Sequence, residues 1–437
     1  MPWWHVACDL MDPMTLPPSL PATLATPANS WTCPFCSLLC EGLGLSSDAE
    51  PQLSGSTCSR ALASLGAHAS APAAASPRVD GLAVTLDAAI AAAAIRLAAW
   101  QQPLFGGLGT DIAGARALYR LAARTGAVCD HADGAALMHG VRAVQDRGQF
   151  ITTLGELRSR ADLVVFVGTT GVARFPELFR RIGLGEAASP CRDVVFLGVE
   201  APPQMPASLS MQELPGSGDL FTDVQQLSAL VARQQAHDAN PALAALAQQL
   251  HEARYAVLVC EAATLPAEGA LIVEALNRIV GTLNRSTRAA TFGLGGSDGA
   301  FSVNQTFTWL SGLPLRTRVS ARGLVHEPRL FDAQRLIEDG AVDGLLWVSS
   351  FDPQRVPPAT VLPRIVLGPP AMASLLQEAD ASRGSVFIPV ATPGLNAAGH
   401  LFRTDGPIVL PVFAARDAGL PGVAAVLSRL CETMGPA

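Results

Sequence analysis

The chain has 437 residues, which is too long for one ordinary hydrophobic core, so we expect two or three domains. Its 37 acidic residues outnumber its 30 basic residues, all of them arginine, and it has no basic block that could follow a phosphate backbone, which excludes nucleic acid as a partner. Only 15% of the residues are charged and the mean hydropathy is +0.30, so we expect partner subunits to cover part of an apolar surface in a hetero-oligomer.

The N-terminal residues 1–29 are predicted to form a flexible leader. The first 28 residues contain no arginine or lysine, unlike the charged start of a secretory signal, and their repeated prolines interrupt any long helix. The most apolar later run, residues 82–100, contains Asp87 and Arg96, which favours a helix packed inside the protein over a membrane span. We therefore expect a cytoplasmic protein with no membrane partner, in which cysteines stay reduced and serve as metal ligands.

Residues 30–66 form a four-cysteine module. Cys33, Cys36 and Cys40 have C-x2-C-x3-C spacing, and Cys58 follows after 17 intervening residues. An iron–sulfur cluster needs four converging thiolates, and this loop supplies three of them while the fourth returns from a separate turn. Zinc also accepts four cysteines, although structural zinc sites more often use two C-x2-C knuckles, and the second knuckle is absent. The spacing favours the cluster over two alternatives, a zinc ion and buried thiols with no metal.

A linker rich in alanine and proline, residues 67–80, follows the module and marks a domain boundary. Beyond it, helical stretches alternate with short β-branched strands, which predicts an α/β fold with a mostly parallel sheet and helices on both faces. The predicted helices span residues 86–100, 112–126, 223–233, 241–252 and 268–283. The predicted strands span residues 163–168, 194–199, 256–260, 344–348, 364–367 and 385–390.

Several of these strands end in glycine, proline or small polar residues. In open α/β sheets, such loops lie at the carboxyl ends of the strands, where backbone amides and helix N-termini can hold the phosphates of a large cofactor. The alternative for any single loop is that these residues only turn the chain. The most glycine-dense loop, GLGGSDG at residues 293–299, has neither the G-x-G-x-x-G order nor a Walker lysine, so it is a weak nucleotide motif.

Two histidines, His131 and His139, flank the segment ADGAALM. Their spacing places them on no shared helical face with a third ligand, so we expect turn and surface roles rather than metal binding. The sequence has no Ser-His-Asp spacing and no G-x-S-x-G elbow to support covalent hydrolysis.

Five ordered motifs follow the cysteine module CPFCSLLC. They are TGAVCDHADG (125–134), TLGELRSRADLVVFVGTTGVARFPELF (153–179), GGSDGAFSVNQTFTWLSGLPL (295–315), GAVDGLLWVSSFDP (340–353) and SVFIPVATPGLNAAGHLFRTDG (385–406). In this order they resemble the B subunit of formylmethanofuran dehydrogenase, which is itself similar to the catalytic subunits of molybdopterin oxidoreductases. The resemblance covers residues 30–415.

The resemblance implies a molybdopterin-oxidoreductase-like scaffold, with a small N-terminal iron–sulfur domain and two interleaved Rossmann-like α/β domains. On this chain, we expect one α/β domain to combine residues 81–108 with residues 290–437, and the other to be inserted at residues 109–289. The fourth domain of the scaffold, a β-barrel, is carried by a separate chain in this family and is not expected here.

The resemblance also implies a site. It assigns a [4Fe–4S] cluster to the four cysteines of the module, and it places Arg60, two residues after Cys58, between this cluster and a pterin. Family members often have lysine at this position. Gly295 and Gly296 are the candidate residues of a vestigial pterin pocket.

The chain departs from the family where molybdenum or tungsten is held. The family's protein ligand is a cysteine or selenocysteine, and the matching stretch GGLGTDIAGARAL (106–118) contains neither. Asp111 is either an N-cap that opens the helix from Ile112 or an oxygen ligand, and we favour the N-cap. The strand at residues 163–168 continues into GTTGVARFPE rather than the family's WG-x-NP-x-x-x-H-P-R, so supporting polar groups are missing as well. We therefore expect no molybdopterin or tungstopterin and no catalytic residue in this chain.

A B-like subunit that performs no redox step is typical of the bacterial formyltransferase/hydrolase complex, which the chain also resembles. This resemblance implies a non-catalytic, structural B subunit in one-carbon metabolism from formaldehyde to formate. The implied partners are a formyltransferase subunit, a zinc amidohydrolase-like subunit and a further subunit. Two alternatives are an active molybdenum or tungsten formylmethanofuran dehydrogenase subunit, using Asp111 or no protein ligand, and an electron-transfer module that uses the cluster alone.

Overall fold

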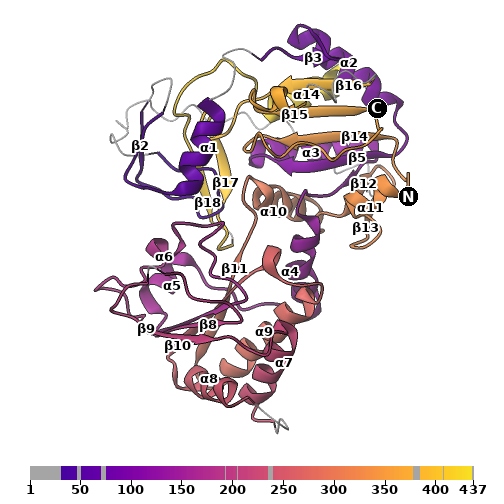
Figure 1. Cartoon of the computed structure of the whole chain (residues 1–437). Helices are drawn as coiled ribbons and strands as arrows, with labels where there is room; N and C mark the ends of the chain where they lie inside the picture. Colours follow the sequence, from indigo (N-terminus) through magenta and orange to yellow (C-terminus); the bar gives the residue numbers. More distant parts are fainter. Residues whose placement is uncertain are drawn as a thin grey trace, which may run out of the picture.

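The computed structural model describes residues 31–46, 51–69, 75–191, 193–203, 205–234, 240–376, 384–406 and 408–435. The predicted leader at residues 1–29 lies outside these ranges. Figure 1 shows two α/β units, one above the other, each built on its own β-sheet, with the cysteine module beside them. The larger sheet takes strands from both ends of the α/β region, whereas the smaller sheet takes all its strands from the middle of the chain.

The larger sheet has nine strands in the order β13-β12-β6-β5-β14-β15-β16-β3-β4. Its central strands are parallel: β6 (Val128–Cys129), β5 (Pro103–Gly109), β14 (Gly344–Ser349), β15 (Arg364–Gly368) and β16 (Ser385–Pro389). Its outer strands are antiparallel: β12 (Thr317–Ser320), β13 (Gly323–His326), β3 (Arg78–Val79) and β4 (Leu82–Ala83). The expectation of a mostly parallel sheet therefore holds for the centre of this sheet, and short antiparallel hairpins form its two edges.

Both faces of this sheet are covered, because alternate residues of a strand point to opposite faces. Phe105 and Leu346 pack in a core with α2 (Leu86–Ala99), α3 (Ile112–Thr125), α10 (Ala300–Ser311) and α14 (Val423–Thr433). Their neighbours Leu104 and Leu345 pack in a separate core with the short helices α11 (Ala333–Glu338) and α12 (Met372–Leu375).

The smaller sheet has five parallel strands in the order β11-β10-β7-β8-β9. They are β7 (Leu163–Val167), β8 (Asp193–Leu197), β9 (Ser210–Leu214), β10 (Tyr255–Glu261) and β11 (Arg288–Leu294). One face packs on α7 (Leu220–Val231), α8 (Pro241–Glu252) and α9 (Gly269–Leu283). The other face packs on α5 (Leu154–Arg160) and α6 (Leu178–Arg181). The 3-10 turn η1 (Ala262–Thr264) follows β10, and α4 (Gly134–Arg147) lies against α9.

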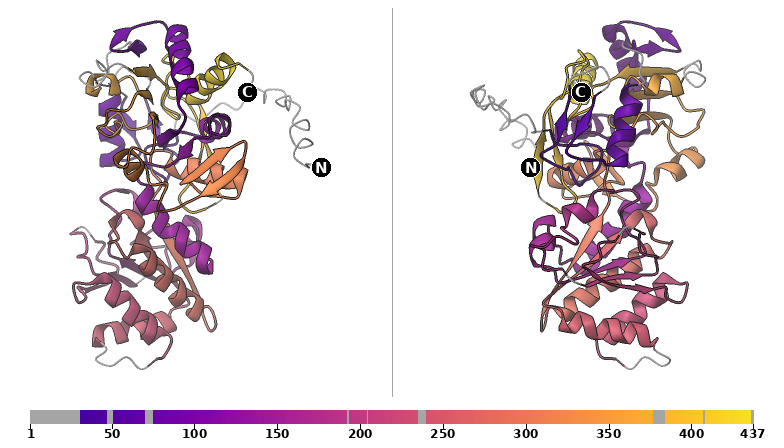
Figure 2. Two further views of the ribbon diagram at one scale, coloured as in Figure 1. Left: turned by 90° about the vertical axis from the view of Figure 1, so that its right-hand side faces the viewer. Right: turned by 60° about the vertical axis from the view of Figure 1, so that its left-hand side comes forward.

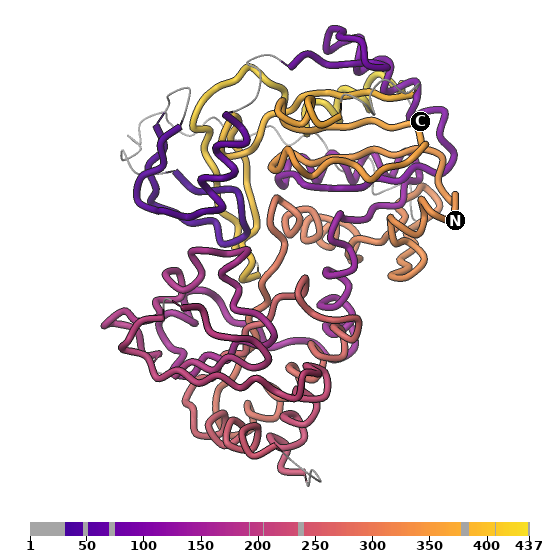
Figure 3. The backbone as a smooth tube through the Cα atoms, viewed as in Figure 1, coloured from indigo at the N-terminus to yellow at the C-terminus, as the bar shows by residue number. Residues whose placement is uncertain are grey.

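The cysteine module contains the antiparallel pair β1 (Gly44–Leu45) and β2 (Leu53–Ser54), followed by α1 (Ser59–Ala69). Its apolar residues share one buried cluster with the α5–α6 face of the smaller sheet. A hairpin of β17 (Gly399–Phe402) and β18 (Val409–Val412) runs beside the module, as Figures 2 and 3 show in yellow and indigo. At its turn, the Thr404 backbone N–H donates to the Ser37 carbonyl at 2.9 Å, and the Thr404 hydroxyl donates to the Gly293 carbonyl at 2.9 Å. The hairpin thus ties the module to the smaller unit.

Helix α3 has clear start and stop signals. The Asp111 carboxylate accepts a hydrogen bond from the Gly114 N–H at 2.9 Å and so satisfies one of the free amides of the first turn. Gly126 ends the helix in the left-handed conformation, with φ of 72°, which glycine adopts without strain. The sequence prediction of an N-cap at Asp111 is confirmed.

All five predicted helices and all six predicted strands are present, with ends that shift by a few residues. The elements that the sequence analysis did not predict include α4, α14, the strands β5 and β11, which are rich in glycine or alanine, and α10, which contains β-branched and aromatic residues. No helix among the residues described is both long and apolar enough to cross a membrane.

Candidate functional site

All four cysteines of the module are buried and lie in one cluster of packed residues. The Cys33 N–H donates to the Cys40 carbonyl at 2.9 Å, which closes the loop that carries the first three thiols. Within the described ranges, no group of three or more His, Cys, Asp or Glu side chains is arranged to hold a metal ion. The thiols are therefore gathered in one place without converging on a single ion position.

The environment of the thiols opposes their ionisation. Burial, with repulsion from neighbouring thiols, raises the pKa of Cys33 well above its usual value, that of Cys36 to about 12 and that of Cys40 to about 11. A metal group supplies the positive charge that displaces such tightly held protons.

Several groups around the thiols would stabilise negative charge on sulfur. Hydrogen bonds from the backbone at Phe35 and Leu38 lower the pKa of Cys33 and Cys36, respectively, against the effect of burial. Arg181 acts in the same direction on the pKa of Cys40, and its Nε is buried without a hydrogen-bond partner among the described residues. Four buried thiols with amide donors and a guanidinium whose Nε has no hydrogen-bond partner fit an anionic metal–thiolate group.

Arg60 connects the module to the glycine-rich loop. Its Nε donates to the Phe35 carbonyl at 2.6 Å, within the loop of the first three thiols. One of its terminal nitrogens lies 2.9 Å from each carboxylate oxygen of Asp298, whose side chain is 7% exposed. Burial raises the pKa of Asp298, while Arg60 and Arg355 oppose that shift.

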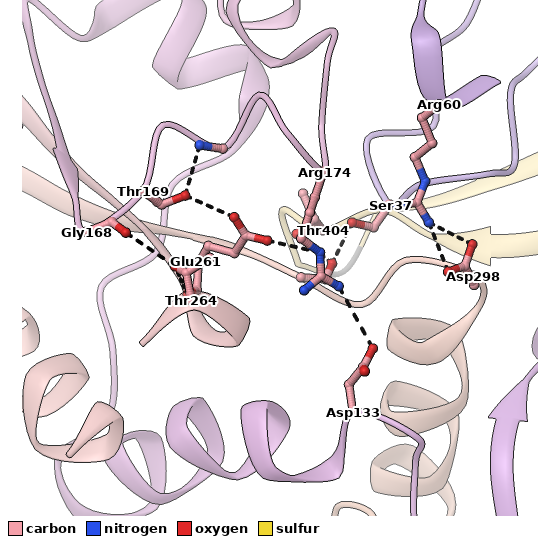
Figure 4. A network of polar contacts seen from close by, with 12 residues as sticks. Ser37, Arg60, Asp133, Gly168, Thr169, Arg174, Glu261, Thr264, Asp298 and Thr404 are labelled. Atoms are coloured by element: carbon pink, nitrogen blue, oxygen red, sulfur yellow. Dashed lines mark hydrogen bonds and ion pairs between the residues drawn. The ribbon is translucent and has the colours of Figure 1, made fainter. Parts of the chain in front are cut away.

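From Asp298, alternating charges continue toward the smaller unit. Arg355 lies 3.9 Å from Asp298 and 2.9 Å from Asp133, at the start of α4. Arg174 lies 3.9 Å from Asp133 and 3.1 Å from Glu261, at the end of β10. Figure 4 shows Arg174 between these two carboxylates, and the Arg60–Asp298 pair on the other side of the view. The network of Arg60, Asp298, Arg355, Asp133, Arg174 and Glu261 is called the charge network below.

The GTTG turn after β7 holds one end of the charge network. The Thr169 hydroxyl donates to Glu261 Oε2 at 3.0 Å and accepts from the Gly171 N–H at 2.9 Å (Figure 4). Burial raises the pKa of Glu261, and the contacts with Thr169 and Arg174 oppose that shift. The residues that replace the family's polar motif therefore position a buried carboxylate.

A cavity of about 470 Å³ adjoins the charge network, between α4, α10, η1 and the turn at residues 404–406. Asp133 and Arg174 supply charge to its lining, and the side chains of α4 and α10 supply apolar surface. His131 also lines it and is buried, which corrects the expectation of a surface role. The His131 Nδ1 accepts from the Asp133 N–H at 2.9 Å, and burial lowers the pKa of His131 to about 4.

The two predicted glycines, Gly295 and Gly296, line the same cavity. The Gly295 carbonyl accepts from the Ser37 hydroxyl at 2.6 Å, which joins the loop to the cysteine module (Figure 4). Gly296 has φ of 71°, and a Cβ atom there would lie 2.4 Å from the Cβ of Phe301. Backbone geometry alone therefore requires glycine at position 296.

Asp111 does not line this cavity. Its carboxylate is buried at the turn from β5 to α3, where burial raises its pKa and backbone hydrogen bonds from Gly114, Ala113 and His400 oppose the shift. Two of these amides belong to the first turn of α3 and the third belongs to β17. The carboxylate therefore caps the helix and holds β17 against it.

The sequence analysis identified Arg60 but missed its partner and the rest of the charge network. Arg60 and Asp298 are 238 positions apart, and Arg355 and Asp133 are 222 positions apart, so no local spacing relates them. One signal in the sequence could have found these residues. Because only 15% of the residues are charged, charged residues in loops that follow buried strands are unusual and could have been singled out.

No family model matches the chain. The B subunit of the formyltransferase/hydrolase complex from Methylorubrum extorquens is 30% identical over 366 residues, which are 82% of this chain and 97% of that protein. The B subunit of the tungsten-containing formylmethanofuran dehydrogenase 2 from Methanocaldococcus jannaschii is 25% identical over 312 residues, 66% of this chain and 69% of that protein.

A solved structure matches as well. It is a chain in the crystal structure of the formyltransferase/hydrolase complex FhcABCD from Methylorubrum extorquens with methylofuran. The TM-score is 0.69 at 28% identity, and the match covers 82% of this chain and 98% of that chain. This chain belongs to the family of the B subunit of the formyltransferase/hydrolase complex.

Proposed function

We propose that this chain is a structural, non-catalytic B subunit of a formyltransferase/hydrolase complex in one-carbon metabolism. One observation carries the proposal. At the turn from β5 to α3, where related redox enzymes place the cysteine ligand of molybdenum or tungsten, this chain has Asp111, whose Oδ1 caps the helix at 2.9 Å. This carboxylate caps α3 and also accepts a hydrogen bond from the His400 backbone, so its oxygens stabilise the fold.

The charge network supports the same function. Its six side chains neutralise one another in the region between the cysteine module and the cavity. Buried charges are stable only when they are paired, and these pairs leave few free groups to bind a second anionic cofactor. We therefore propose that the chain carries no molybdopterin or tungstopterin.

We propose that the four cysteines still hold a [4Fe–4S] cluster. A four-iron cluster can transfer single electrons when bound; here its proposed role is to brace the module. Cys33, Cys36, Cys40 and Cys58 would ligate it, and the backbone at Phe35 and Leu38 and the Arg181 side chain would stabilise its negative charge. Zinc also binds four thiolates, but it needs them to converge on one ion position, which the thiols of the described residues do not do.

The proposed partners are a formyltransferase subunit, a zinc amidohydrolase-like subunit and a further subunit, all in the cytoplasm. The alternative of an active molybdenum or tungsten enzyme is less well supported, because the tungsten-containing relatives match at 25% and 23% identity, lower than the 30% of the formyltransferase/hydrolase relative.

The test is to purify the complex anaerobically through a tag on this chain and to measure its subunits, metals and activity. We expect the three partner subunits, formyltransferase/hydrolase activity, and neither molybdenum nor tungsten bound to this chain. An Asp111→Asn variant, which keeps a capping oxygen, should leave subunit composition and activity unchanged. If the unmodified chain holds near-stoichiometric tungsten or molybdenum and the Asp111→Asn variant loses it, the proposed structural role of Asp111 is wrong.

A further inference from the structure

The smaller unit carries an arginine-rich hollow over α9, away from the cysteine module. Two adjoining depressions, of about 490 and 950 Å³, share Phe150, Gly281 and Arg285 in their walls. Together they are lined by six of the chain's 30 basic residues: Arg147, Arg160, Arg254, Arg278, Arg285 and Arg288. In a chain of net charge -7, this gathering of arginines, called the arginine hollow below, marks a site for an anionic ligand.

The positive charge of the arginine hollow is only partly neutralised. Three of its arginines pair with acidic side chains, Arg147 with Glu274, Arg160 with Glu156 and Arg254 with Asp162. Arg285 and Arg288 are exposed and form no ion pair with any residue that the structure describes. These two guanidinium groups lie at the junction and in the larger depression, where they are available to carboxylates.

A buried amide in the smaller depression narrows the class of ligand. Asn277 on α9 lines it and is only 6% exposed, yet neither its Nδ2 nor its Oδ1 has a hydrogen-bond partner among the described residues. Buried polar groups are normally satisfied, so both atoms point to a missing partner. A peptide group supplies one acceptor and one donor and can satisfy both. An ionised carboxylate accepts from Nδ2 but has no proton for Oδ1. A hydrogen phosphate ion has one, so the experiment below tests phosphate directly against the peptide.

Apolar surface lies between the two depressions. Phe150 is 56% exposed and Ile151 is 52% exposed, and both line the larger depression. We propose that the arginine hollow binds an acidic, extended segment of a partner polypeptide. The carboxylates of the segment meet Arg285 and Arg288, and an apolar side chain covers Phe150. One of its peptide groups meets Asn277 after that side chain turns toward the depression, because both polar atoms are buried in the structure. Extended peptides offer peptide groups and alternating side chains in this way.

The test uses the full-length chain and a fluorescently labelled eight-residue peptide of alternating glutamate and leucine, with both ends blocked. We expect binding by fluorescence anisotropy that weakens as salt is raised, because charge pairs are screened. The double variant Arg285→Glu/Arg288→Glu should lower affinity by about tenfold or more, since like charges now face the glutamates. Arg322→Glu, an exposed arginine at the turn between β12 and β13, is the matched control and should bind as the unmodified chain does.

Two further arms distinguish the alternatives. A peptide of the same length with lysine in place of glutamate should not bind, whereas binding of both peptides would contradict an acidic partner. Inorganic phosphate should fail to displace the acidic peptide. Complete displacement by phosphate, or equal affinity of the double variant, would overturn the proposal in favour of a small-anion site or no specific site.

Asn277→Leu separates a binding role from a structural one. Leucine has nearly the same size and removes the two unpaired atoms, so we expect a higher melting temperature together with peptide affinity about tenfold weaker. If Asn277 instead served the fold, for example through a buried water molecule, the variant would melt at a lower temperature and bind the peptide unchanged. That result would refute the role of Asn277 in peptide recognition.

Discussion

One terminal nitrogen of Arg60 lies 2.9 Å from both carboxylate oxygens of Asp298, a residue 238 positions further along the chain. Arg60 stands in the first turn of α1, just after the fourth cysteine, and Asp298 stands in the glycine-rich loop before α10. The same guanidinium holds the Phe35 carbonyl through Nε. The pair therefore fastens the cysteine module to the larger unit.

Loss of this pair should destabilise the chain strongly. Arg60→Met leaves the Asp298 carboxylate buried with only Arg355 nearby, at 3.9 Å, and we expect a loss of about 3–5 kcal/mol in the free energy of unfolding. Urea unfolding of the full-length chain measures this loss. The double variant Arg60→Met/Asp298→Asn should be less destabilised than the sum of the two single variants, because no buried charge is left unpaired. Strict additivity would show that the two side chains are not coupled.

The metal of the module should depend on its own cysteines. Cys36→Ser replaces one thiol of the proposed ligand set, and we expect the iron content of the anaerobically purified complex to fall to a small fraction of its original value. Cys129→Ser is the matched control, because Cys129 is also buried but lies in the larger unit. If the unmodified chain holds zinc rather than iron, the module is a zinc site and not a cluster site. If neither the unmodified chain nor the variants hold a metal at the module, the four thiols have no ligand.

Acid should destabilise the chain through His131. Its folded-state pKa is lowered to about 4 by burial, below the ordinary value of 6.5, so the unfolded chain takes up the proton first as pH falls. Above pH 6.5 His131 is neutral in both states, and the free energy of unfolding is not reduced by its protonation. Between pH 6.5 and 4 the free energy of unfolding falls by up to about 1.4 kcal/mol per pH unit. His131→Asn retains an acceptor for the Asp133 N–H but does not titrate. Unfolding free energies of the two chains should therefore converge as pH falls, and parallel curves would contradict the assignment.

Glycine at position 296 should be required by geometry. Gly296→Ala places a Cβ atom 2.4 Å from the Cβ of Phe301 at a φ of 71°, so we expect a loss of about 1–3 kcal/mol in stability from backbone strain and overpacking. Gly293→Ala, near the end of β11 and three residues before Gly296, is the control, since nothing lies within 4 Å of the position that its Cβ atom would take. Melting temperatures report the difference, and equal effects of the two substitutions would rule out the geometric explanation.

Capping by Asp111 should be separable from metal ligation. Asp111→Ala removes the acceptor of the Gly114 N–H and should cost about 0.5–2 kcal/mol, whereas Asp111→Asn keeps an acceptor and should cost less. Thermal unfolding gives the order of stability. An equal loss of stability in the two variants would mean that the negative charge, and not the cap, is what the site needs.

The helices and strands with regular apolar patterns could be read from the sequence, because each depends on residues a few positions apart. Residues 241–252 are predicted as a helix with the same ends that α8 has, and the capping Asn240 and Pro241 explain why. Strands β5 and β11 escape prediction because they are rich in glycine or alanine and have almost no β-branched residues, so their pairing with neighbouring strands defines them.

The sequence by itself indicated the four-cysteine module, a basic residue at position 60 and the family resemblance. Each of these rests on residue types at short, fixed spacings. Only the tertiary structure decided which carboxylate Arg60 meets, that His131 is buried, and that Asn277 lies unpaired among arginines. The physical reason is that electrostatic and hydrogen-bond partners are chosen by distance in space, and the two sheets bring together side chains that the sequence separates by more than two hundred residues.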